Sequence, residues 1–210
     1  MTNSAKHSFL FAMLFLCFNI ALIAKPFEST YKPLPSINVL IKNANIYDGE
    51  GNELLQTDLL IKDRKIEAIG KDLPVTNDFE VIDASGKWVT PGIIDIHSHM
   101  GVYPAPGVRT SSDGNEATSP VTADVWAEHS MWVQDPQYTL ALSGGVTAFH
   151  VLPGSANLIG GRGVTVKNLQ RVTINSMKFP DAPHSLKMAC GENPKRVYGN
   201  RQQAPSTRMG

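Results

Sequence analysis

Residues 81–99, VIDASGKWVTPGIIDIHSH, decide the fold of this chain. The stretch ends in a short apolar run closed by two histidines, a pattern that predicts a buried strand. Side chains alternate along a strand, so His97 and His99 share one side with Asp95, and the isoleucines between them point to the other side, where helices can pack. Two neutral imidazoles side by side suit one divalent metal ion.

The residues before this stretch predict a small β module over residues 37–90. Residues 37–47 are rich in isoleucine and valine, and a run of turn-forming residues follows them. Two further short runs, 58–62 and 65–69, are separated by Asp63-Arg64, which signals a tight hairpin. We expect this β module to pack on a larger body, because about 50 residues bury only a marginal core alone.

The residues after it predict alternating strands and helices over residues 91–210. A long loop rich in Gly, Pro and Ser (101–120) precedes a short helix (136–143) and a second apolar strand (146–152). A third main strand is predicted at 185–190. This order indicates an α/β fold with a parallel sheet.

The N-terminus has the pattern of a secretory signal peptide over residues 1–24, followed by a proline-rich linker at 25–36. Cleavage after Ala24 would leave no stable membrane insertion, and an uncleaved anchor is the alternative. Cleavage would also remove Cys17 and leave Cys190 alone, without an internal disulfide. We therefore expect export to the periplasm or cell surface of a bacterium.

Charge and composition narrow the class of partner. The chain of 210 residues carries 19 Lys plus Arg and 19 Asp plus Glu, and its formal net charge is zero. Such a balance, with no block of basic residues, gives no electrostatic footprint for nucleic acid. A small-molecule substrate is the expected partner, and oligomerisation is left open.

The stretch 81–99 resembles the start of the barrel in the amidohydrolase superfamily of metal-dependent hydrolases. Two later stretches, GGVTAFHVLPGSANLIGGRG (144–163) and LKMACGENPKRVYG (186–199), resemble an exported subgroup related to imidazolonepropionase. The resemblance implies a small β-sandwich followed by a (β/α)8 TIM-like barrel, whose first strand ends in the H-x-H metal motif.

The resemblance also implies the chemistry and the metal ligands. It predicts hydrolysis of carbon–nitrogen bonds in non-peptide amides or cyclic amides by water activated on a divalent ion, usually zinc. His97 and His99 would hold the ion. Glu192 resembles a metal-binding glutamate of the family's mononuclear deacetylase branch, with a turn role in GENP as the alternative. Lys187 is the weaker candidate, as the family's carboxylated bridging lysine, because that residue normally comes from the next strand.

The glycine-rich segment 160–163 (GGRG) could cradle an anion through its backbone N–H groups. In that interpretation Arg162 binds a substrate carboxylate. The alternative is a turn that lets two backbone segments approach closely. His150, inside the second apolar strand, is expected to pack in the barrel wall, and Asp95 to orient a neighbour rather than bind metal.

Length sets the last expectation. A (β/α)8 barrel takes about 250 residues, whereas residues 91–210 number 120. We therefore expect an N-terminal fragment with an incomplete barrel that is inactive alone, and a proton-transferring aspartate beyond residue 210. An N-acyl-sugar deacetylase, a prolidase-like peptidase and a non-catalytic exported remnant remain alternatives.

Overall fold

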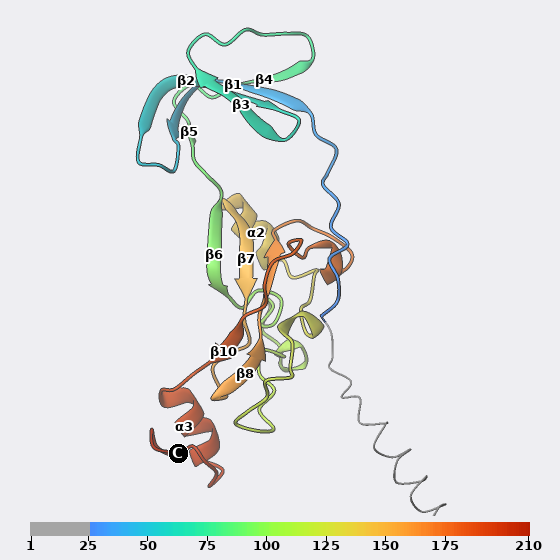
Figure 1. Ribbon diagram of the computed structural model, residues 1–210, viewed down its shortest axis with the longest axis vertical. Coiled ribbons are helices and arrows are strands. Elements are labelled where there is room, and N and C mark those ends of the chain that lie inside the picture. The colour runs from blue at the N-terminus through green and yellow to red at the C-terminus, as the bar shows by residue number, and fades with distance from the viewer. Residues whose placement is uncertain (1–25) are drawn as a thin grey trace, which may run out of the picture.

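The computed structural model describes residues 26–210, so the predicted signal peptide lies outside the described residues. The described residues form three β-sheets, one at the top of Figure 1 and two in the body below it. Within residues 26–210 no helix is long and apolar enough to cross a membrane.

The N-terminal module is a single five-stranded sheet. Its strands are β1 (Asn38–Tyr47), β2 (Glu53–Lys62), β3 (Lys65–Gly70), β4 (Phe79–Asp83) and β5 (Trp88–Val89). The order is β3-β2-β1-β4, with β5 also pairing β1. The first three strands pair antiparallel, as the hairpin signals predict, whereas β4 and β5 run parallel to β1. Its small core contains Ala44, Ile46, Leu59 and Ala84.

The expected sandwich is therefore only partly realised. The predicted short strands are present, but residues 37–90 form one sheet layer instead of the two layers of a sandwich. Apolar side chains of this layer stay open to solvent: Ile66 is 62% exposed and Trp88 is 48% exposed. A one-layer sheet leaves such side chains uncovered, because a sheet buries both faces only between two other layers.

The body begins with the predicted βαβ unit. Strand β6 (Ile93–Ser98) pairs parallel with β7 (Val146–Val151), and α2 (Gln137–Ser143) comes directly before β7. Strand β9 (Val164–Lys167) then pairs antiparallel with β7, giving the order β6-β7-β9. The βα alternation is thus confirmed for β6, α2 and β7, and β9 departs from the all-parallel expectation.

A second, two-stranded sheet pairs β8 (Ile159–Arg162) antiparallel with β10 (Leu186–Met188). Strand β8 coincides with most of the glycine-rich segment, for which a turn or a cradle was predicted. The chain continues into α3 (Glu192–Gly199), where only a turn was expected. Pro194 is tolerated there because backbone N–H groups in the first helical turn have no intrahelical partner.

The main core lies between α2 and the β6-β7-β9 sheet. The α2 residue Tyr138 packs edge-on against Phe149, with ring centroids 5.8 Å apart. The isoleucines on the other face of β6 were predicted to pack against helices. Within residues 26–210 they do not, since Ile94 is 64% exposed and Ile96 is 77% exposed. The buried cluster contains Val102, Ala127, Tyr138, Phe149, Val151, Val164, Val166 and Met177.

The predicted linker 25–36 is in part a docked element. Its first residues, here called the strap (26–32), run along the body in Figure 1 before the chain enters the N-terminal sheet. The backbone N–H of Phe27 donates to a Glu128 carboxylate oxygen at 3.1 Å. The Lys178 ammonium donates to the Phe27 carbonyl and to the other Glu128 oxygen. A buried ion pair therefore holds the strap, which composition alone did not reveal.

Candidate functional site

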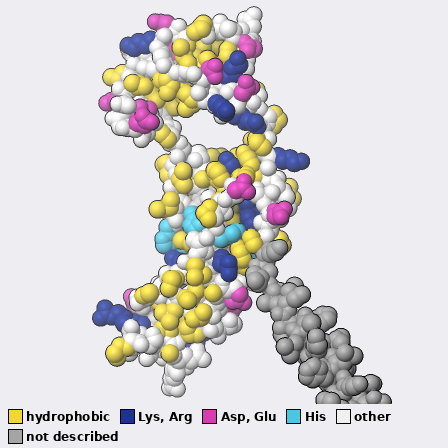
Figure 2. All heavy atoms as spheres, in the orientation of Figure 1, with side chains coloured by type: hydrophobic (Ala, Val, Ile, Leu, Met, Phe, Trp, Pro, Cys, Tyr) yellow, Lys and Arg dark blue, Asp and Glu magenta, His cyan; other side chains and the backbone are white. Residues whose placement is uncertain are grey.

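The two predicted histidines lie at the C-terminal end of β6, with His99 just after its last residue. The ring centroids of His97 and His99 are 5.3 Å apart, and their planes are nearly perpendicular. Figure 2 shows the histidine side chains gathered in the middle of the body. The strand register explains the pairing, because residues two apart on a strand face the same side.

One hydrogen bond fixes the tautomer of His99. Its Nδ1 lies 2.9 Å from the backbone carbonyl oxygen of Leu152, just after β7. A carbonyl oxygen only accepts, so Nδ1 carries the proton and Nε2 keeps its lone pair. Such a second hydrogen bond is typical of a histidine that binds metal through its other nitrogen. Asp95 orients the neighbouring backbone, as expected: its carboxylate accepts the His97 N–H at 3.1 Å.

Lys187 reaches the histidine pair from the other sheet. Its Nζ lies 3.1 Å from Nε2 of His97, a contact that joins β10 to β6. The positive charge of Lys187, followed by burial, lowers the pKa of His97 below its ordinary value. Burial also lowers the pKa of Lys187 itself. Both shifts favour the unprotonated bases, the forms that can bind a metal ion.

Glu192, the predicted third ligand, is elsewhere. It is the first residue of α3, its side chain is 85% exposed, and a carboxylate oxygen lies 3.8 Å from Nε of Arg196. Within residues 26–210 no three His, Cys, Asp or Glu side chains form a group that could hold a metal ion. The structure therefore brings Lys187, not Glu192, to the histidines. Strand alternation was the available signal, because Lys187 lies between apolar neighbours on β10.

Arg162, the predicted substrate-binding residue, is held against the body. Its guanidinium carbon lies 4.7 Å from the centroid of the Trp126 ring, and its Nε donates to the Ala123 carbonyl at 3.2 Å. Nearby Gly161 has φ +112°, and a Cβ there would lie 2.6 Å from the Val125 carbonyl oxygen. These contacts favour close backbone approach over an anion cradle as the reason for the glycines.

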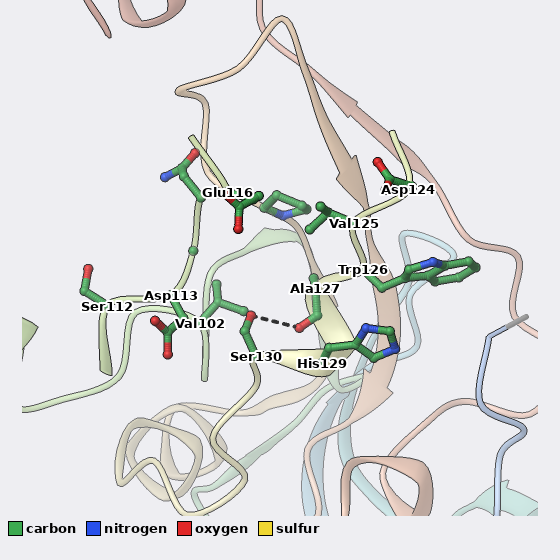
Figure 3. Close-up of a pocket in the computed structure, with 13 residues that line it drawn as sticks. Val102, Ser112, Asp113, Glu116, Asp124, Val125, Trp126, Ala127, His129 and Ser130 are labelled. Atoms are coloured by element: carbon green, nitrogen blue, oxygen red, sulfur yellow. Dashed lines mark hydrogen bonds between the residues drawn. The ribbon is translucent and has the colours of Figure 1, made fainter. Parts of the chain in front are cut away.

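A cavity of about 420 Å³ opens beside this region. Figure 3 shows Asp113 on one side of it and Asp124 with Trp126 on the other. The guanidinium of Arg162 lies over the Trp126 ring. The predicted substrate-binding arginine is therefore at the margin of the cavity. None of His97, His99, Arg162 or Glu192 lines the cavity, so the cavity is distinct from the histidine site.

Fold and site together define an α/β chain with a histidine pair at the end of a parallel strand. Comparisons with known proteins identify its relatives. The chain is 36% identical over 197 residues to "Amidohydrolase tasK" of Hapsidospora irregularis, covering 81% of this chain and 20% of that protein. A crystal structure of an amidohydrolase from Thermotoga maritima matches with a TM-score of 0.74 and 44% identity, covering 82% of this chain and 44% of that one.

A shorter match points the same way. A dihydroorotase of Lactobacillus helveticus is 44% identical over 77 residues, covering 37% of this chain and 16% of that protein. No family model matches the chain. Together the relatives support placing the chain in the amidohydrolase superfamily, and their names indicate hydrolases. The chain spans about a fifth or less of the length of these curated relatives.

Proposed function

We propose that this chain carries the first part of the active site of a metal-dependent hydrolase that cleaves carbon–nitrogen bonds. The single observation behind the proposal is that His97 and His99, at the end of β6, meet Lys187 of β10, a strand of a different sheet. The similarity to amidohydrolases over most of the described chain supports the same reaction class.

The side chains present fit a divalent metal ion as part of its ligand set. Nε2 of His99 keeps a lone pair because Nδ1 is bonded to Leu152, and the pKa of His97 is lowered. Imidazole nitrogen suits zinc, copper, iron and nickel, and zinc is the ion that the family resemblance implies. When bound, such an ion supplies Lewis-acid activation of water and of the substrate carbonyl. The protein's own part is to hold both rings and to fix the His99 tautomer through the Leu152 carbonyl.

In this proposal Lys187, instead of the predicted Glu192, is the third member of the metal site. The superfamily resemblance includes a lysine whose amine is carboxylated. The unprotonated Nζ would attack carbon dioxide, an N–C bond would form, and one proton would leave to solvent. The lowered pKa of Lys187 favours the required free amine, and the 3.1 Å contact with His97 places the product beside the metal ligands.

The proposed substrates are small cyclic amides. The dihydroorotase name of one relative refers to dihydroorotate, which is a cyclic amide, and the resemblance to the imidazolonepropionase-related subgroup agrees. The test is to assay the zinc-loaded protein, produced from the entire reading frame that contains residues 1–210, with cyclic ureides, N-acyl sugars and dipeptides, each with a chelator control. Hydrolysis of cyclic ureides alone supports the proposal. Activity on N-acyl sugars or dipeptides alone would replace it with a deacetylase or peptidase function, and inactivity on all three with a non-catalytic remnant.

Arg162→Ala tests the proposed carboxylate anchor. If Arg162 binds a substrate carboxylate, KM rises about tenfold or more, the value of one charge-assisted hydrogen bond, while kcat changes little. Steady-state kinetics on a substrate with and without its carboxylate measures both constants. A KM that is unchanged, or a KM increase equal for both substrates, would leave Arg162 with only its packing role on Trp126.

We also propose export to the periplasm or cell surface of a bacterium. The support is the sequence pattern of residues 1–24, with a polar start, an apolar run and a small residue at its end. N-terminal sequencing of the protein from fractionated cells checks this. A mature chain that starts at Lys25 in the exported fraction agrees, and a chain that still starts at Met1 in the cytosol contradicts it.

A further inference from the structure

Two sheets meet at the candidate site without sharing a strand ladder. Among the described residues, β6-β7-β9 form one sheet and β10-β8 form the other. Side chains bridge the gap at two places. One is the contact of Lys187 with His97, and the other is a contact between His150 of β7 and Ser185, the residue just before β10. The second bridge has no part in the proposed chemistry.

His150 is held at both ring nitrogens. Its Nδ1 lies 2.9 Å from Oγ1 of Thr165 on β9, and its Nε2 lies 2.6 Å from Oγ of Ser185. A neutral imidazole offers one donor and one acceptor, and each hydroxyl can take either role, so both contacts are satisfied together. Because both nitrogens are occupied in this way, His150 is not placed to bind a metal ion.

The backbone leaves room for this bridge at one glycine. A Cβ at Gly163 would lie 2.6 Å from Oγ of Ser185 and 3.0 Å from Nε2 of His150. The Gly163 N–H also donates to the Ser185 carbonyl at 3.0 Å. Any larger residue would therefore push Ser185 and His150 apart, which gives a second physical reason for the glycine-rich sequence.

Ser185 and Lys187 are two residues apart in an extended segment. Burial alternates along it, half-buried at Ser185 and Lys187 and exposed at Leu186 and Met188, so the first two share a side. Lys187 also lies beside Gly160 of β8: its Cγ is 3.8 Å from where a Cβ on Gly160 would be, an ordinary van der Waals distance. Because Gly160 has no side chain that could hold Lys187, the direction of Lys187 depends on how β10 is held.

We propose that the bridge Thr165–His150–Ser185 is a positioning device that holds β10 so that Lys187 meets His97. His150 is a positioning residue in this inference and does not touch substrate. The inference rests on the proposed function only for its consequence for metal binding. The placement of Lys187 can be measured without a metal ion.

The test compares Ser185→Ala and Thr165→Val with Thr165→Ser, which keeps the hydroxyl. The metal-free protein is treated with a trace of acetic anhydride, and mass spectrometry gives the acetylation of Lys187 relative to exposed Lys65. Loss of one bridging hydrogen bond should raise this ratio about three- to tenfold, and Thr165→Ser should leave it near the wild-type value. A general loosening would change Lys187 and Lys65 alike.

A second measurement is zinc affinity by chelator competition, in the presence of bicarbonate. Ser185→Ala should weaken zinc binding about 10- to 100-fold, as expected for a residue that positions a metal ligand without binding the metal. The matched serine control is Ser143→Ala, at the end of α2, which should change neither readout. An acetylation ratio that is unchanged in Ser185→Ala and Thr165→Val would overturn the positioning role. A raised ratio in a protein whose wild type binds no zinc would support the bridge and reject the proposed function.

Discussion

Replacing His99 with alanine is expected to lower the affinity of the protein for zinc by more than about 100-fold. Mutating a residue that only hydrogen-bonds to a metal ligand already lowers metal affinity by about 10- to 100-fold. The structure gives a specific reason. His99 is the histidine whose tautomer is set, with Nδ1 bonded to the Leu152 carbonyl and Nε2 left for the metal. Alanine removes the ligand and leaves that carbonyl without its donor. Hydrolysis of the best substrate should fall in parallel.

The measurement is metal content after equilibration with limiting zinc, together with chelator competition. His129→Ala is the matched control, because His129 is also partly exposed but its ring packs at a tilt against Phe27 of the strap instead of joining the pair. Its zinc content should equal that of the wild type. Full zinc binding by His99→Ala would remove the histidine pair from the proposed metal centre.

Replacing Glu128 with alanine is expected to lower the free energy of unfolding by about 3–5 kcal/mol. The Glu128 side chain is fully buried and the Lys178 side chain is 7% exposed. Without the carboxylate, the Lys178 ammonium is left buried with the Phe27 carbonyl as its remaining partner, and the Phe27 N–H loses its acceptor. The cost is large because a buried charge without its counterion has lost solvation and attraction together.

Urea titration of the protein measures the change. The double variant Glu128→Leu with Lys178→Met should regain much of the loss, because an apolar pair needs no counterion. Glu192→Gln is the exposed comparison: its ion pair with Arg196 lies in solvent and should contribute no more than about 1 kcal/mol. A loss below about 1 kcal/mol in Glu128→Ala would mean that the pair does not hold the strap.

The parts of the fold that sequence could predict are those with a local cause. Alternation on β6 placed His97 and His99 on one side, and the proline and glycine signals bounded α2 correctly to within a residue. Contacts between distant segments had no such local cause. The 3.1 Å approach of Lys187 to His97 joins residues 90 positions apart, and it made Lys187, not Glu192, the third member of the site.

Composition misled in two further places. The glycines of segment 160–163 predicted a turn or an anion cradle, but they form strand β8 and let backbone and side chains approach closely. Prolines predicted a linker before β1, but a charge pair 101 to 151 residues further along the chain holds Phe27. In each case the decisive partner was remote, and residue type alone does not specify a remote partner.

The docking of the strap changes where the body begins. The chain contacts the body at Phe27, leaves it to build the β1–β5 sheet, and returns at β6. The N-terminal sheet is therefore an excursion within the body, and the body is discontinuous in sequence, made of residues 26–32 and 93–210. A boundary drawn at residue 91 would remove a segment that covers the Glu128–Lys178 pair. Any version of the body without the sheet should therefore keep both pieces, joined across the excursion by a short connection.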